Sequence, residues 1–200
     1  PIILMVNSKL GVSNVKDFVR YAKANKGKVT FGSSGTWSGP HMAGEQFSVA
    51  TGTDLQFIPY QGVPAAITAL LGEQIQSVFA TAPTAAGFAK DDRVKLLAVA
   101  SDNRSSLLPE VPTLQEEGLK GADTSIWYGF FAPKGTPLAI RQKLAEAIAK
   151  ITLRPDVKEA LRRVGCEPLS IQLDALGSYV VKDIENWKGV TERVKAKMKH

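Results

Sequence analysis

A segment rich in glycine and hydroxyl residues, Gly-Ser-Ser-Gly-Thr-Trp-Ser-Gly at positions 32–39, is the first place in this sequence where residue types could bind a ligand. It follows a predicted strand at 29–31 and precedes a predicted helix at 40–50. A helix N-terminus offers free amides and a positive dipole end, and glycines allow a ligand to approach the backbone. We predict an anion site here, although an ordinary Gly/Ser turn would have the same composition. The expected contacts are Ser33, Ser34, Gly35 and Thr36.

Phosphate-loop and hydrolase motifs do not fit this segment. Its glycines stand at 32, 35 and 39, which matches neither G-x-G-x-x-G nor G-x-S-x-G, and no lysine follows them. His41 could still act as a base toward Ser33 or Ser34, which defines the alternative function, a hydrolase or transferase acting on an activated acid. That reading requires a serine oxygen within about 2.6–3.2 Å of the ring. Otherwise His41 either hydrogen-bonds locally and supports the loop or contacts the ligand.

Two further strand-to-helix loops repeat the pattern, at 59–64 and 80–85. Loops at the carboxyl ends of parallel strands meet at one sheet edge, where ligands bind. The stretch 29–89 contains no Lys or Arg and only three acids, so a ligand there must be held by amides, hydroxyls and aromatic faces. We find no catalytic pair or metal set, and predict a binding protein without enzymatic activity, metal or cofactor. The added site residues are His41, Tyr60, Gly62, Val63 and Thr81.

The elements around these loops alternate between strand and helix patterns. Short apolar runs predict the strands, and helical spacing of apolar residues predicts the helices between them. This alternation is typical of an α/β fold with a mainly parallel sheet covered by helices. The predicted strands are 2–6, 29–31, 55–58, 75–79 and 94–100, and the helices are 14–25, 40–50 and 64–71.

The last third of the sequence has a different pattern. An apolar run predicts a strand at 127–132, and three amphipathic helices follow, the last from Leu173 to Val194. One strand is a small surface for three helices, which indicates an incomplete lobe. We predict an α/β ligand-binding lobe at 1–123 and a strand with C-terminal helices at 124–200. If the chain is truncated, exposed helix faces would favour a homo-oligomer.

Composition excludes several classes of function. The net charge of +6 lies entirely in residues 134–200. The basic residues are spread over helical faces and become more frequent from Arg193 to Lys199. No nucleic-acid-binding motif accompanies them. We therefore expect no nucleic-acid partner. No apolar run is long enough to span a membrane. The chain begins without Met or a basic leader and looks processed or trimmed, so its lack of a signal peptide says little about its compartment.

Several motifs, in this order, resemble the Bug family, the extracytoplasmic solute receptors of tripartite tricarboxylate transporters. The similarity covers nearly the whole chain. The motifs are Val-Thr-Phe-Gly-Ser-Ser-Gly at 29–35, Pro-His-Met-Ala-Gly-Glu at 40–45, Ile-Pro-Tyr-Gln-Gly at 58–62, Pro-Glu-Val-Pro-Thr at 109–113 and Trp-Tyr-Gly-Phe-Phe-Ala-Pro-Lys-Gly-Thr-Pro at 127–137.

This resemblance implies a two-lobed periplasmic-binding-protein fold of type II that closes around a small organic carboxylate. It implies a periplasmic location and membrane permease subunits as partners. Relatives grip the carboxylate with backbone amides and hydroxyls, which agrees with the cation-free stretch.

Two departures from the family pattern qualify what the resemblance implies. Members usually extend about 100 residues further at the N-terminus, and that stretch carries an anion loop of the other lobe. Where relatives often have Asp-Asn, this chain has Ala80-Thr81, which makes an amino-acid ligand less expected. Trp37 leaves room for an aromatic or longer apolar acid.

Overall fold

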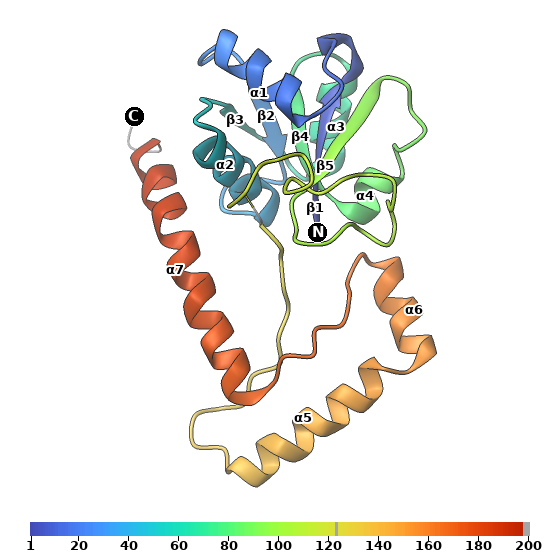
Figure 1. Ribbon diagram of the computed structural model, residues 1–200, viewed down its shortest axis with the longest axis vertical. Helices are drawn as coiled ribbons and strands as arrows, with labels where there is room; N and C mark the ends of the chain where they lie inside the picture. Colours follow the sequence, from blue (N-terminus) through green and yellow to red (C-terminus); the bar gives the residue numbers. More distant parts are fainter. Residues whose placement is uncertain (123, 198–200) are drawn as a thin grey trace. The chain divides into compact units, whose positions relative to one another are not determined.

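The computed structural model describes residues 1–122 and 124–197 and contains two compact units, Pro1–Ile126 and Trp127–His200 (Figure 1). The division falls three residues after the boundary predicted from the sequence. Asp123, the last residue of the predicted first lobe, lies outside the described residues, as does the end of the basic tail at 198–200.

Unit 1 is built on a five-stranded sheet with the order β3-β2-β4-β1-β5. β2 pairs in parallel with β3 and with β4, whereas β1 pairs antiparallel with β4 and with β5. Four strands therefore point in one direction and β1 points in the other. The strands are β1 (Ile2–Asn7), β2 (Thr30–Ser33), β3 (Gln56–Pro59), β4 (Ser77–Thr81) and β5 (Val94–Val99).

The predicted α/β class is confirmed, and the reversed direction of β1 qualifies the prediction of a mainly parallel sheet. β1 lies between β4 and β5, and all six of its residues are buried. Burial on both faces produces a continuous apolar run in either orientation, so the sequence pattern carries no information on strand direction.

Two hydrophobic clusters cover the two faces of this sheet. Alternate residues of β1 belong to different clusters, Ile2 and Leu4 to one, Ile3 and Met5 to the other, as the two-residue period of a strand requires. Helices α1 (Val15–Ala24) and α2 (Gly39–Thr51) contribute to the first cluster, and α3 (Val63–Leu71) and α4 (Ala82–Ala86) contribute to the second. Figure 1 shows the helices on the two sides of the sheet. Unit 1 therefore has three layers.

Two helices of unit 1, α1 and α2, begin with side-chain caps, whereas α3 and α4 have none. Asn14 accepts the Asp17 amide at 2.8 Å before α1, and Ser38 accepts the His41 amide at 3.3 Å before α2. α2 ends at Gly52 in the left-handed conformation. The helices are α1 (Val15–Ala24), α2 (Gly39–Thr51), α3 (Val63–Leu71) and α4 (Ala82–Ala86).

Unit 2 contains the helices α5 (Leu138–Thr152), α6 (Pro155–Arg163) and α7 (Leu173–Lys197). The predicted strand at 127–132 is wrong, because these residues have no regular secondary structure. Tyr128, Phe130 and Phe131 are largely exposed. A strand requires a neighbour to satisfy its backbone hydrogen bonds, and the described part of unit 2 offers no other strand. Within the described residues, none of the helices is both long and apolar enough to cross a membrane.

The packing of α2 on the sheet depends on a close approach at Gly44. A Cβ atom at this position would lie 2.2 Å from the Phe31 ring of β2. Phe31 is fully buried and cannot move aside without displacing the rings around it.

We predict that Gly44→Ala destabilises the protein by about 1–3 kcal/mol, because the added methyl overpacks the core. Gly189→Ala on α7, where a Cβ atom meets nothing within 4 Å, is the matched control and should be neutral or stabilising by up to about 1 kcal/mol. Urea denaturation followed by circular dichroism measures both. Equal effects of the two substitutions would show that Gly44 is not a packing requirement.

Candidate functional site

The three predicted ligand loops lie at one edge of the sheet. They follow β2, β3 and β4, which are adjacent and parallel, so their carboxyl ends are side by side. The first two loops also contact each other, because the Tyr60 amide donates to the Ser33 carbonyl at 3.2 Å. The arrangement places the residues predicted from the sequence around one region of unit 1.

The first loop is closed by a tight turn from Gly35 to Ser38. The Ser38 amide and hydroxyl both donate to the Gly35 carbonyl, at 3.3 and 2.8 Å. Within this turn Trp37 has a φ of 64°, which is uncommon for a residue with a side chain. Among the described residues, no hydrogen bond engages the backbone amides of Ser34, Gly35 and Thr36. The loop therefore presents three consecutive N–H groups that a ligand could use.

The predicted site residues differ in accessibility. Ser33 is the last residue of β2 and is fully buried, with its Oγ 3.4 Å from the Ser38 Oγ. Val63 opens α3 and is buried in the second hydrophobic cluster. These two residues could reach a ligand only through their backbone. Thr36 is exposed, and Ser34, Gly35, Tyr60, Gly62 and Thr81 are half-buried.

The second and third loops bring further polar groups to the same edge. Gly62 has a φ of 101° and precedes α3, whose N-terminus has no side-chain cap. Only glycine adopts such a backbone readily. At the end of β4, the Thr81 Oγ1 lies 3.0 Å from the Thr84 Oγ1 in α4. Hydroxyls and amides, rather than cations, are thus the available groups.

His41 lies in the first turn of α2 beneath the first loop and is 2% exposed. Its Nδ1 accepts the Trp37 amide at 3.0 Å, and its Nε2 lies 3.9 Å from the buried Glu45 carboxylate. Its ring packs on Phe57, with centroids 3.9 Å apart. Both ring nitrogens thus have neighbours other than a serine oxygen, an arrangement that does not favour the alternative in which His41 activates Ser33 or Ser34.

A fourth loop lies at the same sheet edge and was missed by the sequence reasoning. Because β1 is antiparallel to both β4 and β5, these two strands run in the same direction. Thr81 at the end of β4 lies opposite Ile2, and Val99 at the end of β5 lies opposite Ile3. The segment 101–105 therefore begins at the same sheet edge as the third loop, with the first residues of β1 between them. The sequence did predict the strand at 94–100 that precedes this loop. Knowing the direction of that strand would have been enough to assign the loop to this sheet edge.

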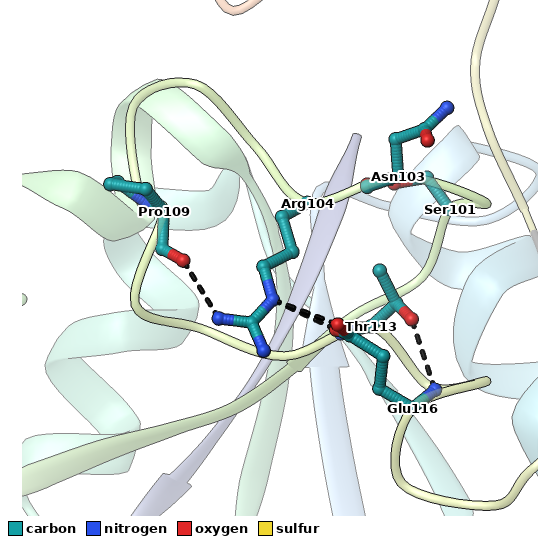
Figure 2. Close-up of polar contacts among 6 residues, drawn as sticks. All are labelled: Ser101, Asn103, Arg104, Pro109, Thr113 and Glu116. Carbon is teal, nitrogen blue, oxygen red and sulfur yellow. Dashed lines mark hydrogen bonds and ion pairs between the residues drawn. The ribbon is translucent and has the colours of Figure 1, made fainter.

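An ion pair holds the fourth loop in shape (Figure 2). Arg104 Nε donates to both carboxylate oxygens of Glu116, at 3.1 and 2.9 Å, and Arg104 Nη1 donates to the Pro109 carbonyl at 2.9 Å. Thr113 and Glu116 exchange side-chain-to-amide hydrogen bonds at 2.7 and 3.1 Å, in the manner of a capping box. Hydrogen bonding to Arg104, and then to the Thr113 amide, holds the pKa of Glu116 below its ordinary value.

Two open clefts occur elsewhere on the described surface. One of about 490 Å³ lies over the Arg104–Glu116 pair, and one of about 630 Å³ lies between α5 and α7 in unit 2. The three predicted loops line neither cleft. The amides of Ser34, Gly35 and Thr36 thus lie outside both of these clefts.

Comparisons with known proteins agree on one protein family. Residues 1–195 match the model of the tripartite tricarboxylate transporter family receptor, TctC. The chain is 30% identical over 199 residues to the protein BugT of Bordetella pertussis, covering 100% of this chain and 61% of BugT. The family resemblance predicted from the motifs is confirmed.

Solved structures agree with this family. A TctC solute-binding protein from Polaromonas, solved without ligand, matches with a TM-score of 0.83 and 29% identity over 96% of this chain and 66% of that one. A protein of R. palustris solved with adipate matches with a TM-score of 0.77 and 26% identity over 96% and 64%. The first two curated relatives are spanned to 58% and 61% of their length. The family is one of receptors and the Polaromonas neighbour is a solute-binding protein, which agrees with the expectation of a binding protein rather than an enzyme.

We predict that Arg104→Met raises the pKa of Glu116 part of the way to its ordinary value of 4.5, because the Thr113 amide remains bound to the carboxylate. The lowered pKa means that this pair stabilises the fold at neutral pH and loses its effect as the pH falls through the folded value. Carboxyl-carbon NMR titration measures the shift. Arg93→Met is the control and should raise the pKa of Asp91, which is about 2, without moving Glu116. An unchanged Glu116 titration in Arg104→Met would contradict the assignment.

Proposed function

This chain belongs to the receptor family of tripartite tricarboxylate transporters, and we propose that its unit 1 binds a small organic carboxylate with the loops after β2, β3 and β4. The observation that carries this proposal is the set of three unengaged amides at Ser34, Gly35 and Thr36, in the loop between β2 and the N-cap Ser38 of α2. Successive N–H groups before a helix form an anion-binding concavity.

The charge distribution limits how the negative charge of a ligand can be neutralised. The stretch 29–89 has no cation, and Glu45, its buried acid, lies beneath the loop beside His41. A phosphate-rich ligand would be expected to meet lysine or arginine, whereas one carboxylate can be satisfied by two or three amide donors. Tyr60 and Thr81 add hydroxyls at the same edge for a second polar group of the ligand.

We propose that the whole receptor works in the periplasm and passes its ligand to membrane permease subunits. The family name and the Polaromonas solute-binding protein support this assignment. The sequence reading divides such a receptor into a lobe at 1–123 and a second lobe that includes 124–200. Self-association of this chain remains a prediction from its exposed apolar helix residues.

A linear diacid is the ligand class that we propose, and adipate is the first probe because the R. palustris neighbour was solved with it. Trp37 is 44% exposed and stands beside the amides, where its ring could cover the methylene chain of such a ligand. Thr81 carries no charge to pair with an amino group, so a plain acid fits better than an amino acid.

We expect calorimetry to detect binding of adipate and no binding of adipamide, its uncharged diamide of nearly the same shape. Amide donors stabilise a carboxylate through charge-assisted hydrogen bonds, which an uncharged amide cannot match. A panel of mono-, di- and tricarboxylates extends the measurement to the chemical class. Equal affinity for acid and amide, or silence from every acid, would contradict the proposed function.

We expect Ser34→Ala and Thr36→Ala each to weaken acid binding by about 1–3 kcal/mol where the hydroxyl is a ligand partner, while the fold survives. Thr68→Ala is the matched control, because the Thr68 hydroxyl is exposed on α3 and bonds to the Pro64 carbonyl of its own helix. Calorimetric titration gives the affinities and thermal unfolding checks the fold. Unchanged affinity in both loop variants would contradict a role for these two hydroxyls and would leave the backbone amides as the only ligand contacts of the first loop.

A further inference from the structure

The first loop contains a strained residue held by a buried acceptor. Trp37 has a φ of 64° and occupies the third position of the turn from Gly35 to Ser38, where glycine or asparagine is preferred. A left-handed conformation is unfavourable for a residue with a side chain, so a specific contact must maintain it. The Trp37 amide makes that contact by donating to the Nδ1 of His41 at 3.0 Å.

This hydrogen bond fixes the orientation of the peptide unit that follows the three unengaged amides. The turn would relax if the Thr36–Trp37 peptide rotated and Trp37 returned to a negative φ. The amides of Ser34, Gly35 and Thr36 would then have to be reordered when a ligand bound, which lowers affinity. We propose that His41 is a positioning residue, which sets the anion loop through the Trp37 amide and does not touch the ligand.

The surroundings of His41 favour this indirect role. His41 is 2% exposed, and its ring packs against Phe57 of β3 and Phe31 of β2, neither of which titrates. The charged group that faces it is Glu45 of its own helix, whose carboxylate lies 3.9 Å from the Nε2 atom. The Nδ1 atom can accept the Trp37 amide only while it is unprotonated, because both nitrogens of an imidazolium are donors. Protonation of His41 therefore removes the acceptor that holds the loop.

The inference rests on the proposed function and predicts that adipate affinity falls as the pH is lowered and the Nδ1 atom of His41 takes up a proton. The fall should follow the same midpoint as the shift of the Trp37 amide signal in NMR spectra. Nitrogen-15 NMR of the ligand-free protein at about pH 8 should show the proton on Nε2 and none on Nδ1.

Two substitutions of His41 separate positioning from direct contact. His41→Asn places an acceptor oxygen where Nδ1 stood, whereas His41→Gln places its amide where Nε2 stood. Both variants lose the ring that packs on Phe57, so a general loss of stability is common to them. We expect His41→Asn to keep adipate affinity near the wild-type value and to abolish its pH dependence. His41→Gln should lose about two- to tenfold, the effect of one hydrogen bond.

Each outcome decides the matter. Retained affinity in His41→Gln with loss in His41→Asn would show direct ligand contact through Nε2 and overturn the inference. Equal affinities, or a proton on Nδ1 in the wild-type protein, would overturn it as well and leave the proposed function intact. Failure of the wild-type protein to bind adipate or any other acid would instead remove the function itself. If neither variant folds, the NMR titration of the wild-type protein still decides whether the acceptor is present.

Discussion

Parallel pairing of β2 with β3 on one side and with β4 on the other is the constraint on which the candidate site depends. It places the loops that follow β2, β3 and β4 at the same edge of the sheet, with the first loop between the other two. If one of these strands ran in the opposite direction, its loop would lie at the far edge, some 13–17 Å away for a strand of four or five residues. The same pairing sets the Tyr60 amide against the Ser33 carbonyl, so the first two loops are joined by the sheet itself.

The sequence was sufficient to place the elements of unit 1. Its predicted strands agree with the observed ones within two residues at each boundary, because apolar runs and Gly/Pro turns mark burial and chain reversal. The sequence was insufficient to predict the direction of β1 or the lack of regular secondary structure at 127–132. Both depend on which other strand is available for pairing. An apolar run records that a segment prefers burial, and the described residues of unit 2 give residues 127–132 no strand to pair with.

The loops themselves were predicted because their residue types are a local signal, like the apolar runs that mark the strands. Glycines and hydroxyls at 32–39 are a local signal for a loop. The unengaged amides of Ser34, Gly35 and Thr36 precede the N-cap Ser38, so the free amides expected at the end of a helix do not by themselves predict them. The contact between His41 Nδ1 and Trp37 was outside the reach of that reasoning, because it depends on a side-chain rotamer and on an unusual φ. The Pro-Glu-Val-Pro-Thr motif at 109–113 lies close to the fourth loop in the sequence, yet the relation of that loop to the sheet edge required the direction of β5. Local composition thus identifies the hydrogen-bond donors of each loop, and the pairing of the strands decides which loops lie close together.

One core residue connects the stability of unit 1 to the geometry of its loop. Phe31 on β2 lies against Gly44 of α2, stacks near the His41 ring and contacts Phe57 and Phe79 in the sheet. Its position therefore sets how closely α2 approaches the sheet and, through that, where the Nδ1 of His41 lies beneath the loop. Because well-packed interiors do not deform smoothly, a shift of this ring would move the acceptor of the Trp37 amide with it. The amides offered to a ligand are consequently fixed from below by apolar packing, and no cation within 29–89 is needed to hold them.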